Sequence, residues 1–287
     1  MGFNFLEVFS VMRTILILVL SVGTISLGVI FSLKHFVVSY GQNVVKKSIE
    51  PSFENNETKN REEKERGKKI SYSKLSLPIL MYHHIRENAN SEDKMGNNLS
   101  VPLTSFVKQL DDIKNKGYKT ITFLDIKKGE IPEKSIILTF DDGYDDFYYY
   151  ALPELQRRNL KGVLYIVTDF IGKPGYLNKS QILEIKNYGI EIGSHTLSHR
   201  NLLNLNKEEA DKEIRDSKKY IEDLIGEKVV SFCYPAGKFS PEIEIMVEDV
   251  GYDFAVTTIS GIAQFYKAFE LSRFRVSPST NELNFLK

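Results

Sequence analysis

Two short segments of this 287-residue chain combine carboxylates and histidines at spacings that suit metal-assisted catalysis. In the first, an apolar run at 136–140 leads directly into Asp141 and Asp142. Two adjacent carboxylates can divide two tasks, because one can bind a cation while its neighbour accepts a proton from water on that cation. Taken alone, the segment is equally compatible with a plain Asp-Gly turn on a solvated loop.

The second segment, EIGSHTLSHRNL, places His195 and His199 four residues apart, just after another short apolar run. This spacing directs two imidazoles at one ion if the backbone turns helically there. The chain has five histidines, and a pair placed directly after a strand favours metal binding over a bystander role. Asp142, His195 and His199 would give an ion three protein ligands and leave its other positions for water and substrate.

Two further segments add candidates for the same site. His83 and His84 end the apolar run of LPILMYHHI, and at most one of them faces the site, since neighbours in a strand point to opposite faces. A later run ends at Tyr234 and Pro235, where a turn could aim a backbone N–H at a developing oxyanion. The chain has neither a G-x-S-x-G nucleophile motif nor a P-loop, so we expect no covalent intermediate and no nucleotide.

Composition excludes several other classes of protein. Lys plus Arg and Asp plus Glu number 38 each, so the formal charge is zero, which argues against a nucleic-acid binder. The single cysteine, Cys233, cannot form an intrachain disulfide and has no zinc-finger spacing around it. Hydrophobic residues make up 42% and charged residues 26% of the chain, as in globular proteins with a buried core.

The elements that must position these residues alternate along the chain. Apolar residues at helical spacing predict helices at 105–116, 180–187 and 207–225. Apolar runs predict strands at 77–85, 118–123, 135–140, 163–167, 190–192 and just before Tyr234, with a long polar loop at 86–98. Alternating β and α segments with short loops predict an α/β fold with a mostly parallel sheet, open or closed into a barrel.

The N-terminal part of the chain has a different character. Residues 14–33 carry no charge and are long enough to span a bilayer, so we expect residues 1–40 to form an uncleaved membrane anchor rather than a core helix. Residues 41–76 are polar and charge-dense, which indicates a solvated linker, with a short charged helix at 59–69 as the alternative. The folded domain would then cover 77–287.

The charges beside the span do not settle its orientation in the membrane. Lysines after the span outnumber the single arginine before it, which taken literally favours the C-terminal side inside, but this bias is weak and large C-terminal domains translocate largely regardless of it. We therefore expect a single-pass protein of the cell membrane whose folded domain lies outside the cytoplasm.

Taken together, the four segments resemble the polysaccharide deacetylases of the NodB-homology type, carbohydrate esterase family 4, over about residues 77–278. The sequence at 139–143 reads TFDDG and that at 195–199 reads HTLSH, which match the family motifs TFDDG and H-[ST]-x-x-H. The LPILMYHHI start is similar to the branch that deacetylates surface polysaccharides such as poly-N-acetylglucosamine. The resemblance implies a distorted, partly open (β/α) barrel with its site at the carboxyl ends of the strands.

The resemblance also implies a role for each candidate. Asp141 would be the general base, and His83, in preference to His84, the general acid. The implied ligands of a divalent metal are Asp142, His195 and His199. Zinc is the default ion, although cobalt, nickel and iron suit the same ligands.

Three departures from the family pattern affect these assignments. Cys233 stands where many members have an arginine that orients the base, and we assign that task to Arg273. No histidine follows His199, so the late histidine that often supplies the acid is absent, which is why His83 takes that role. The chain has no tryptophan to line an acetyl pocket, and for the tyrosines at 148–150 we favour buried packing over a sugar platform.

These observations lead to one expectation and one alternative. We expect a membrane-tethered, metal-dependent hydrolase that removes N-acetyl groups from a surface or wall polysaccharide, either poly-N-acetylglucosamine-like or peptidoglycan. The alternative is a catalytically inactive polysaccharide-binding protein with the same fold, which the substitution at Cys233 and the missing late histidine favour. The intact Asp141 argues against it, because a binding protein needs no base beside its metal.

Overall fold

The computed structural model describes residues 72–87, 94–280, 283 and 286. Among these residues, no helix has the length and apolar character that crossing a bilayer requires. The expected span at 14–33 and nearly all of the expected linker lie outside the described residues.

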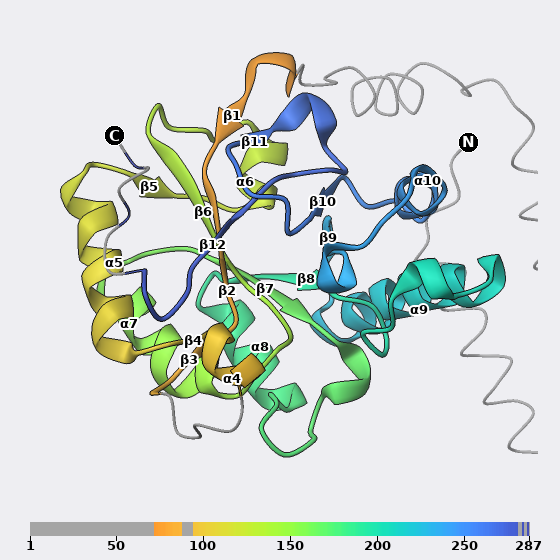
Figure 1. The fold of residues 1–287 in the computed structure, drawn as a ribbon, viewed down its shortest axis with the longest axis horizontal. Coiled ribbons are helices and arrows are strands. Elements are labelled where there is room, and N and C mark those ends of the chain that lie inside the picture. Colours follow the sequence, from red (N-terminus) through yellow and green to blue (C-terminus); the bar gives the residue numbers. More distant parts are fainter. Residues whose placement is uncertain (1–71, 88–93, 281–282, 284–285, 287) are drawn as a thin grey trace, which may run out of the picture. The chain divides into compact units, whose positions relative to one another are not determined.

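A parallel β-sheet forms the centre of the described part. Its strands are β2 (Ile79–Tyr82), β5 (Lys119–Thr120), β6 (Ser135–Phe140), β7 (Val163–Ile166), β8 (Glu191–Ser194), β9 (Ser231–Cys233), β10 (Phe254–Val256) and β12 (Phe274–Arg275). They run in the order β10-β9-β8-β7-β6-β2-β12, with β5 also paired to β6 (Figure 1). Two short pairs accompany the sheet: β1 (Ser76–Leu77) with β11 (Ala263–Gln264), and β3 (His84–Ile85) with β4 (Ser100–Val101).

The sheet curls until its two ends meet one chain segment. At one end, β12 pairs with β2. Just before β12, the Leu271 N–H donates to the Ala255 carbonyl at 3.0 Å, and the Thr257 N–H donates to the Leu271 carbonyl at 2.9 Å, which ties the same segment to β10. The expected α/β fold with a parallel sheet is therefore confirmed, and the sheet has the form of a curled half-barrel.

Helices surround the strands (Figure 1). They are α4 (Lys94–Leu99), α5 (Leu103–Asn115), α6 (Phe123–Lys128), α7 (Leu152–Arg157), α8 (Lys179–Asn187), α9 (Lys207–Ile225) and α10 (Pro241–Asp249). Single helical turns occur at η1 (Tyr72–Lys74), η2 (Phe147–Ala151), η3 (Thr168–Phe170), η4 (Leu202–Asn204), η5 (Pro235–Gly237) and η6 (Phe265–Lys267).

Local capping explains where the prediction of helices succeeds and where it fails. Helix α9 matches its predicted range because Asn206 and Glu209 form a capping box and Gly226 ends the helix in the left-handed conformation. The strand predicted at 118–123 is wrong at its end, because Thr122 forms a capping box with Asp125 and starts α6. The predicted loop at 86–98 is also partly wrong, since α4 begins at Lys94.

Alternation along the strands divides the core in two. In β6, Ile136, Leu138 and Phe140 pack in the cluster that the surrounding helices cover. Ile137 belongs to a second buried cluster, inside the curl of the sheet. Because side chains alternate between the two faces of a strand, Thr139 and Asp141 continue the inner face towards the carboxyl end of β6.

Candidate active site

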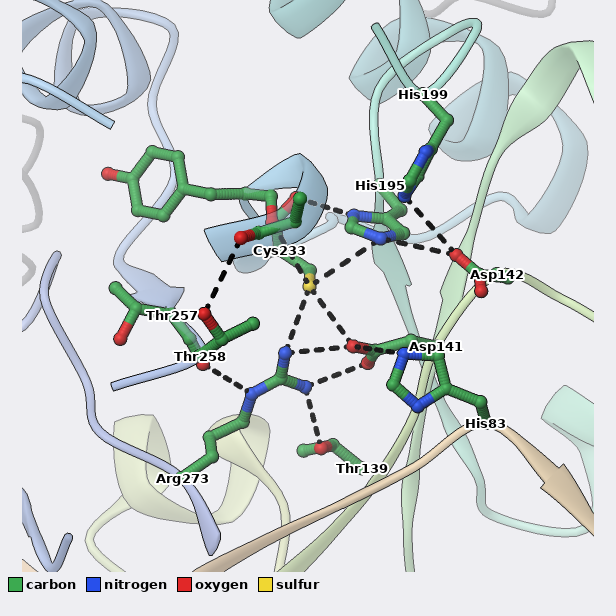
Figure 2. A network of polar contacts seen from close by, with 12 residues as sticks. His83, Thr139, Asp141, Asp142, His195, His199, Cys233, Thr257, Thr258 and Arg273 are labelled. Carbon is green, nitrogen blue, oxygen red and sulfur yellow. Dashed lines mark hydrogen bonds and ion pairs between the residues drawn. The ribbon is translucent and has the colours of Figure 1, made fainter. Parts of the chain in front are cut away.

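The predicted base and its arginine form the most enclosed part of the site. Asp141 and Arg273 are 3% and 1% exposed. The guanidinium makes two bonds to the carboxylate, Nη1 to Oδ1 at 2.7 Å and Nη2 to Oδ2 at 2.8 Å (Figure 2). It also donates to the Thr257 carbonyl at 2.8 Å and to the Thr139 hydroxyl at 2.9 Å. A bidentate, fully bonded ion pair of this kind fixes the carboxylate in one orientation.

The same pair sets the charge of Asp141. Burial alone would raise the pKa of this carboxyl, but the charge and hydrogen bonds of Arg273 outweigh burial and hold the pKa below its ordinary value. Asp141 is therefore ionised near neutral pH and ready to accept a proton.

Cys233 occupies a place beside this pair without replacing the arginine. Its Sγ lies 3.4 Å from Nη2 of Arg273 and 3.6 Å from Oδ2 of Asp141. Burial raises the pKa of the thiol, so the side chain is a neutral neighbour. The arginine that contacts Asp141 thus comes from the segment before β12, where the sequence analysis placed it, and not from the end of β9.

The three predicted metal ligands converge on one point. Nε2 of His195 lies 3.4 Å and Nε2 of His199 lies 3.5 Å from Oδ1 of Asp142 (Figure 2). One ligand atom from each residue can be chosen so that all lie within 4.8 Å of one another. Two imidazoles and a carboxylate at this spacing fit a divalent cation with coordination positions left open.

Neighbouring groups orient the two histidines. Nδ1–H of His195 donates to the Cys233 carbonyl at 2.7 Å, which leaves the Nε2 lone pair directed at Asp142. The His199 N–H donates to the Thr196 hydroxyl at 3.0 Å. His195 is buried, whereas the side chain of His199 is 35% exposed, so solvent reaches the ligand group from the His199 side.

Backbone strain is concentrated in these segments. Among the described residues, five that are not glycine have positive φ, and only Asn159 lies outside the site. The other four are Asp142 (φ 74°), Thr196 (φ 69°), His199 (φ 60°) and Ala236 (φ 52°). A side chain in this region costs about 1–2 kcal/mol per residue, and such strain clusters at functional sites.

The two neighbouring histidines separate as alternation predicts. Nε2 of His83 lies 3.9 Å from Oδ2 of Asp141, inside the site. Nδ1 of His84 instead lies 2.5 Å from Oδ2 of Asp146. Burial lowers the pKa of His83, although the negative charges of Asp141 and Asp142 act in the opposite direction.

The structure corrects the predicted oxyanion donors. The Tyr234 N–H already donates to the Val256 carbonyl at 3.2 Å, and Pro235 has no N–H. The Tyr234 ring is buried and stacks on Phe239. Within this described turn, the Ala236 N–H has no hydrogen-bond acceptor, which makes it the available donor. The sequence contained one indication of this, because a proline has no N–H to donate and the donor must then be another residue of the turn.

The tyrosines at 148–150 also differ from expectation. Tyr149 and Tyr150 are 58% and 47% exposed, so buried packing is wrong for both. They lie on the outward side of η2, which begins close after the site. Tyr148 packs partly against the core, and its hydroxyl donates to Glu184.

Comparisons with known sequences agree with this geometry. The family model for polysaccharide deacetylase matches residues 128–255. YxkH of Bacillus subtilis (strain 168), whose name places it among polysaccharide deacetylases, is 34% identical over 208 residues, covering 70% of this chain and 72% of YxkH. The poly-beta-1,6-N-acetyl-D-glucosamine N-deacetylase of Staphylococcus aureus (strain MRSA252) is 24% identical over 242 residues, covering 75% of this chain and 79% of that protein.

Solved structures show the same fold. The deacetylase PplD of Streptococcus pyogenes, in complex with acetate, superposes with a TM-score of 0.69 at 28% identity, covering 74% of this chain and 99% of PplD. BC0361, a polysaccharide deacetylase from Bacillus cereus, gives a TM-score of 0.65 at 26% identity, covering 72% of this chain and 66% of that one. The chain therefore belongs to the polysaccharide deacetylase family of enzymes.

Proposed function

We propose that the chain is a metal-dependent hydrolase that removes N-acetyl groups from amino-sugar residues of a cell-surface or cell-wall polysaccharide. The observation that carries this proposal is that an ionised base and a candidate metal site lie next to each other. Asp141 is held ionised by Arg273, and next to it Asp142 meets two imidazoles. A protein that only binds polysaccharide has no use for a fixed base beside a metal site.

The residues of this chain supply the groups that amide hydrolysis needs. A divalent cation held by Asp142, His195 and His199 would supply Lewis acidity that polarises the amide carbonyl. Asp141 would accept the proton of the attacking water. The free Ala236 N–H would donate a hydrogen bond to the oxyanion that develops on the carbonyl oxygen.

His83 would complete the proton transfer. Its Nε2 lies 3.9 Å from Oδ2 of Asp141, so a proton donor for the leaving nitrogen would lie beside the base that accepts the proton of water. Because burial lowers the pKa of His83, an imidazolium formed there gives up its proton readily. Acetate and a free amino sugar leave, and both side chains return to their starting protonation states.

The substrate is proposed on two supports. The LPILMYHHI segment is similar to the surface-polysaccharide branch, and a relative at 24% identity is named a poly-beta-1,6-N-acetyl-D-glucosamine N-deacetylase. Peptidoglycan remains the second substrate to test. We further propose that residues 14–33 anchor the chain in the cell membrane with the enzyme domain outside the cytoplasm, and that the resident metal is zinc.

The test is acetate release by the full-length chain, purified in mild detergent and supplied with Zn²⁺, Co²⁺ or Ni²⁺. Oligomers of β-1,6-linked N-acetylglucosamine and peptidoglycan serve as parallel substrates. We expect Asp141→Asn to bind metal like the parent and to release no acetate. Metal binding by the parent without acetate release from either substrate would contradict the proposal and favour a binding protein.

A further inference from the structure

A buried glutamate on α9 contacts the loop that carries the two metal-site histidines, and it takes no part in the chemistry proposed above. Helix α9 packs against β8, the strand that leads into this loop (Figure 1). Glu213 on α9 is 6% exposed. Its carboxylate accepts two hydrogen bonds from Ser198, one from the backbone N–H at 2.9 Å and one from the hydroxyl. Because Ser198 directly precedes His199, these bonds join the helix to the backbone of a candidate metal ligand.

The backbone of this loop is strained at two of its five residues. Thr196 has φ 69° and His199 has φ 60°. A side chain in this left-handed region costs about 1–2 kcal/mol, so contacts with the surrounding structure must hold the loop in this conformation.

Hydrogen bonds from β7 and η3 hold the first part of the loop. The His195 N–H donates to the Ile166 carbonyl at 2.9 Å. Two N–H groups of η3 donate to the carbonyls of Thr196 and Leu197, at 3.2 and 2.8 Å. These backbone contacts end at Leu197, and at Ser198 the carboxylate from α9 takes over as the partner of the loop.

Of the two histidines, His199 depends more on its backbone for its orientation. The ring of His195 is buried, and its Nδ1–H donates to the Cys233 carbonyl. Within the described part of the chain, Nδ1 of His199 has no hydrogen-bond partner, and its side chain is 35% exposed. The approach of its Nε2 to Asp142, at 3.5 Å, therefore follows from the path of the backbone through Ser198 and His199 (Figure 2).

We propose that Glu213 is a positioning residue for the metal site: it holds the N–H and hydroxyl of Ser198 and thereby directs His199 at the ion. This inference rests on the proposed function, because it requires that Asp142, His195 and His199 bind a divalent metal. Loss of a group that orients a metal ligand typically weakens metal affinity by about 10- to 100-fold. Glu213 acts through the neighbouring residue, so we expect the lower end of this range, about 10-fold.

The experiment measures the affinity of the full-length chain for Zn²⁺ by competition with a chelating indicator. Glu213→Ala removes both bonds to Ser198, and its affinity should fall about 10-fold. Glu213→Gln loses the charge, but its amide can accept the N–H and donate to the hydroxyl, so it should restore most of the parental affinity. Parental affinity in Glu213→Ala would overturn the inference. Equal losses in the two variants would also overturn it, because they would point to the charge and not to the bonds.

Glu222→Ala is the matched control on the same helix. The Glu222 carboxylate also accepts a backbone N–H, that of Val229 at 3.0 Å, but Val229 lies before the amino end of β9, at the opposite end of the strands from the metal site. The variant should lose stability in urea and keep the parental affinity for Zn²⁺. A loss of affinity as large as that of Glu213→Ala would mean that any weakening of α9 disturbs the site, and would overturn the specific role of Glu213.

The absorption spectrum of bound Co²⁺ gives a second readout, because it reports the geometry of the ligands. It should change in Glu213→Ala and stay unchanged in Glu222→Ala. If Glu213→Ala does not fold, as judged by circular dichroism, Glu213→Asp replaces it, since a carboxylate that is one methylene shorter cannot keep both bonds. A parental affinity and spectrum in Glu213→Asp would then overturn the inference.

Asp142→Ala distinguishes failure of this inference from failure of the proposed function. Failure of the parent to bind Zn²⁺, or parental binding in Asp142→Ala, would remove the metal site and this inference with it. Binding that depends on Asp142 but is indifferent to Glu213→Ala would leave the proposed function standing and remove only the role of Glu213.

Discussion

Two buried carboxylates lie at opposite ends of the strands, and they differ in charge. Asp141 follows β6 at its carboxyl end, and Glu191 begins β8 at its amino end. Burial raises the pKa of Glu191 to about 7. The hydrogen bonds that this carboxyl accepts from the Leu124 N–H and the Ser231 hydroxyl act in the opposite direction, but both donors are neutral and do not cancel the effect of burial. For Asp141, the charge of Arg273 more than cancels the same effect of burial. Burial is common to both carboxyl groups, so it does not explain the difference in their charge. The difference follows from the bonded cation, which only Asp141 of the two has.

Arg273→Ala should give the largest effect, because it makes Asp141 a buried carboxylate without a cation. Breaking one partner of a buried ion pair costs about 3–5 kcal/mol, so the free energy of unfolding should fall by that amount. Activity should be lost as well, since Asp141 would take up a proton like Glu191. Urea unfolding followed by circular dichroism, together with acetate release, measures both.

The matched variant for that prediction is Arg273→Lys. It keeps the charge but cannot make the two parallel bonds to Asp141, so we expect it to recover more stability than activity. An Arg273→Ala protein with parental stability and rate would show that the ion pair does not hold the base.

Glu191→Gln tests the buried carboxyl that has no bonded cation, through the pH dependence of stability. The pKa of Glu191 rises from 4.5 to about 7 on folding, so the folded state keeps a proton that the unfolded chain has released. The contribution of Glu191 to the free energy of unfolding is therefore fully present below pH 4.5 and is lost as the pH rises through about 7. At about 1.4 kcal/mol per pKa unit, the full loss of unfolding free energy is about 3–4 kcal/mol.

Gln imitates the protonated carboxyl at every pH, so the variant should gain stability over the parent between pH 5 and 8. The difference in unfolding free energy between variant and parent is the quantity to follow, and Glu133→Gln, a change at an exposed glutamate, should show no such trend. Parallel pH profiles for Glu191→Gln and the parent would mean that Glu191 is already ionised in the folded protein.

The same comparison explains how much of the site the sequence could predict. The periods of the apolar residues placed β6 and α9 correctly. Asp141, Asp142, His195 and His199 were singled out because they come at or shortly after the ends of strands. The contact between Arg273 and Asp141 spans 132 residues, so no local pattern contains it, and only the absence of an arginine at Cys233 pointed to it. The oxyanion donor was misplaced because hydrogen bonding to Val256 depends on strand pairing, which the sequence of the turn does not reveal.

Cys233→Ala should give the smallest effect of the series. The thiol contacts both Arg273 and Asp141, but it is a weak hydrogen-bonding group and carries no charge that either partner needs. Arg273 keeps its two bonds to Asp141, so the rate of acetate release should stay within a few-fold of the parent, and the free energy of unfolding should fall by about 1 kcal/mol. A loss of activity as large as that of Arg273→Ala would mean that the thiol, and not only the guanidinium, holds the base in place.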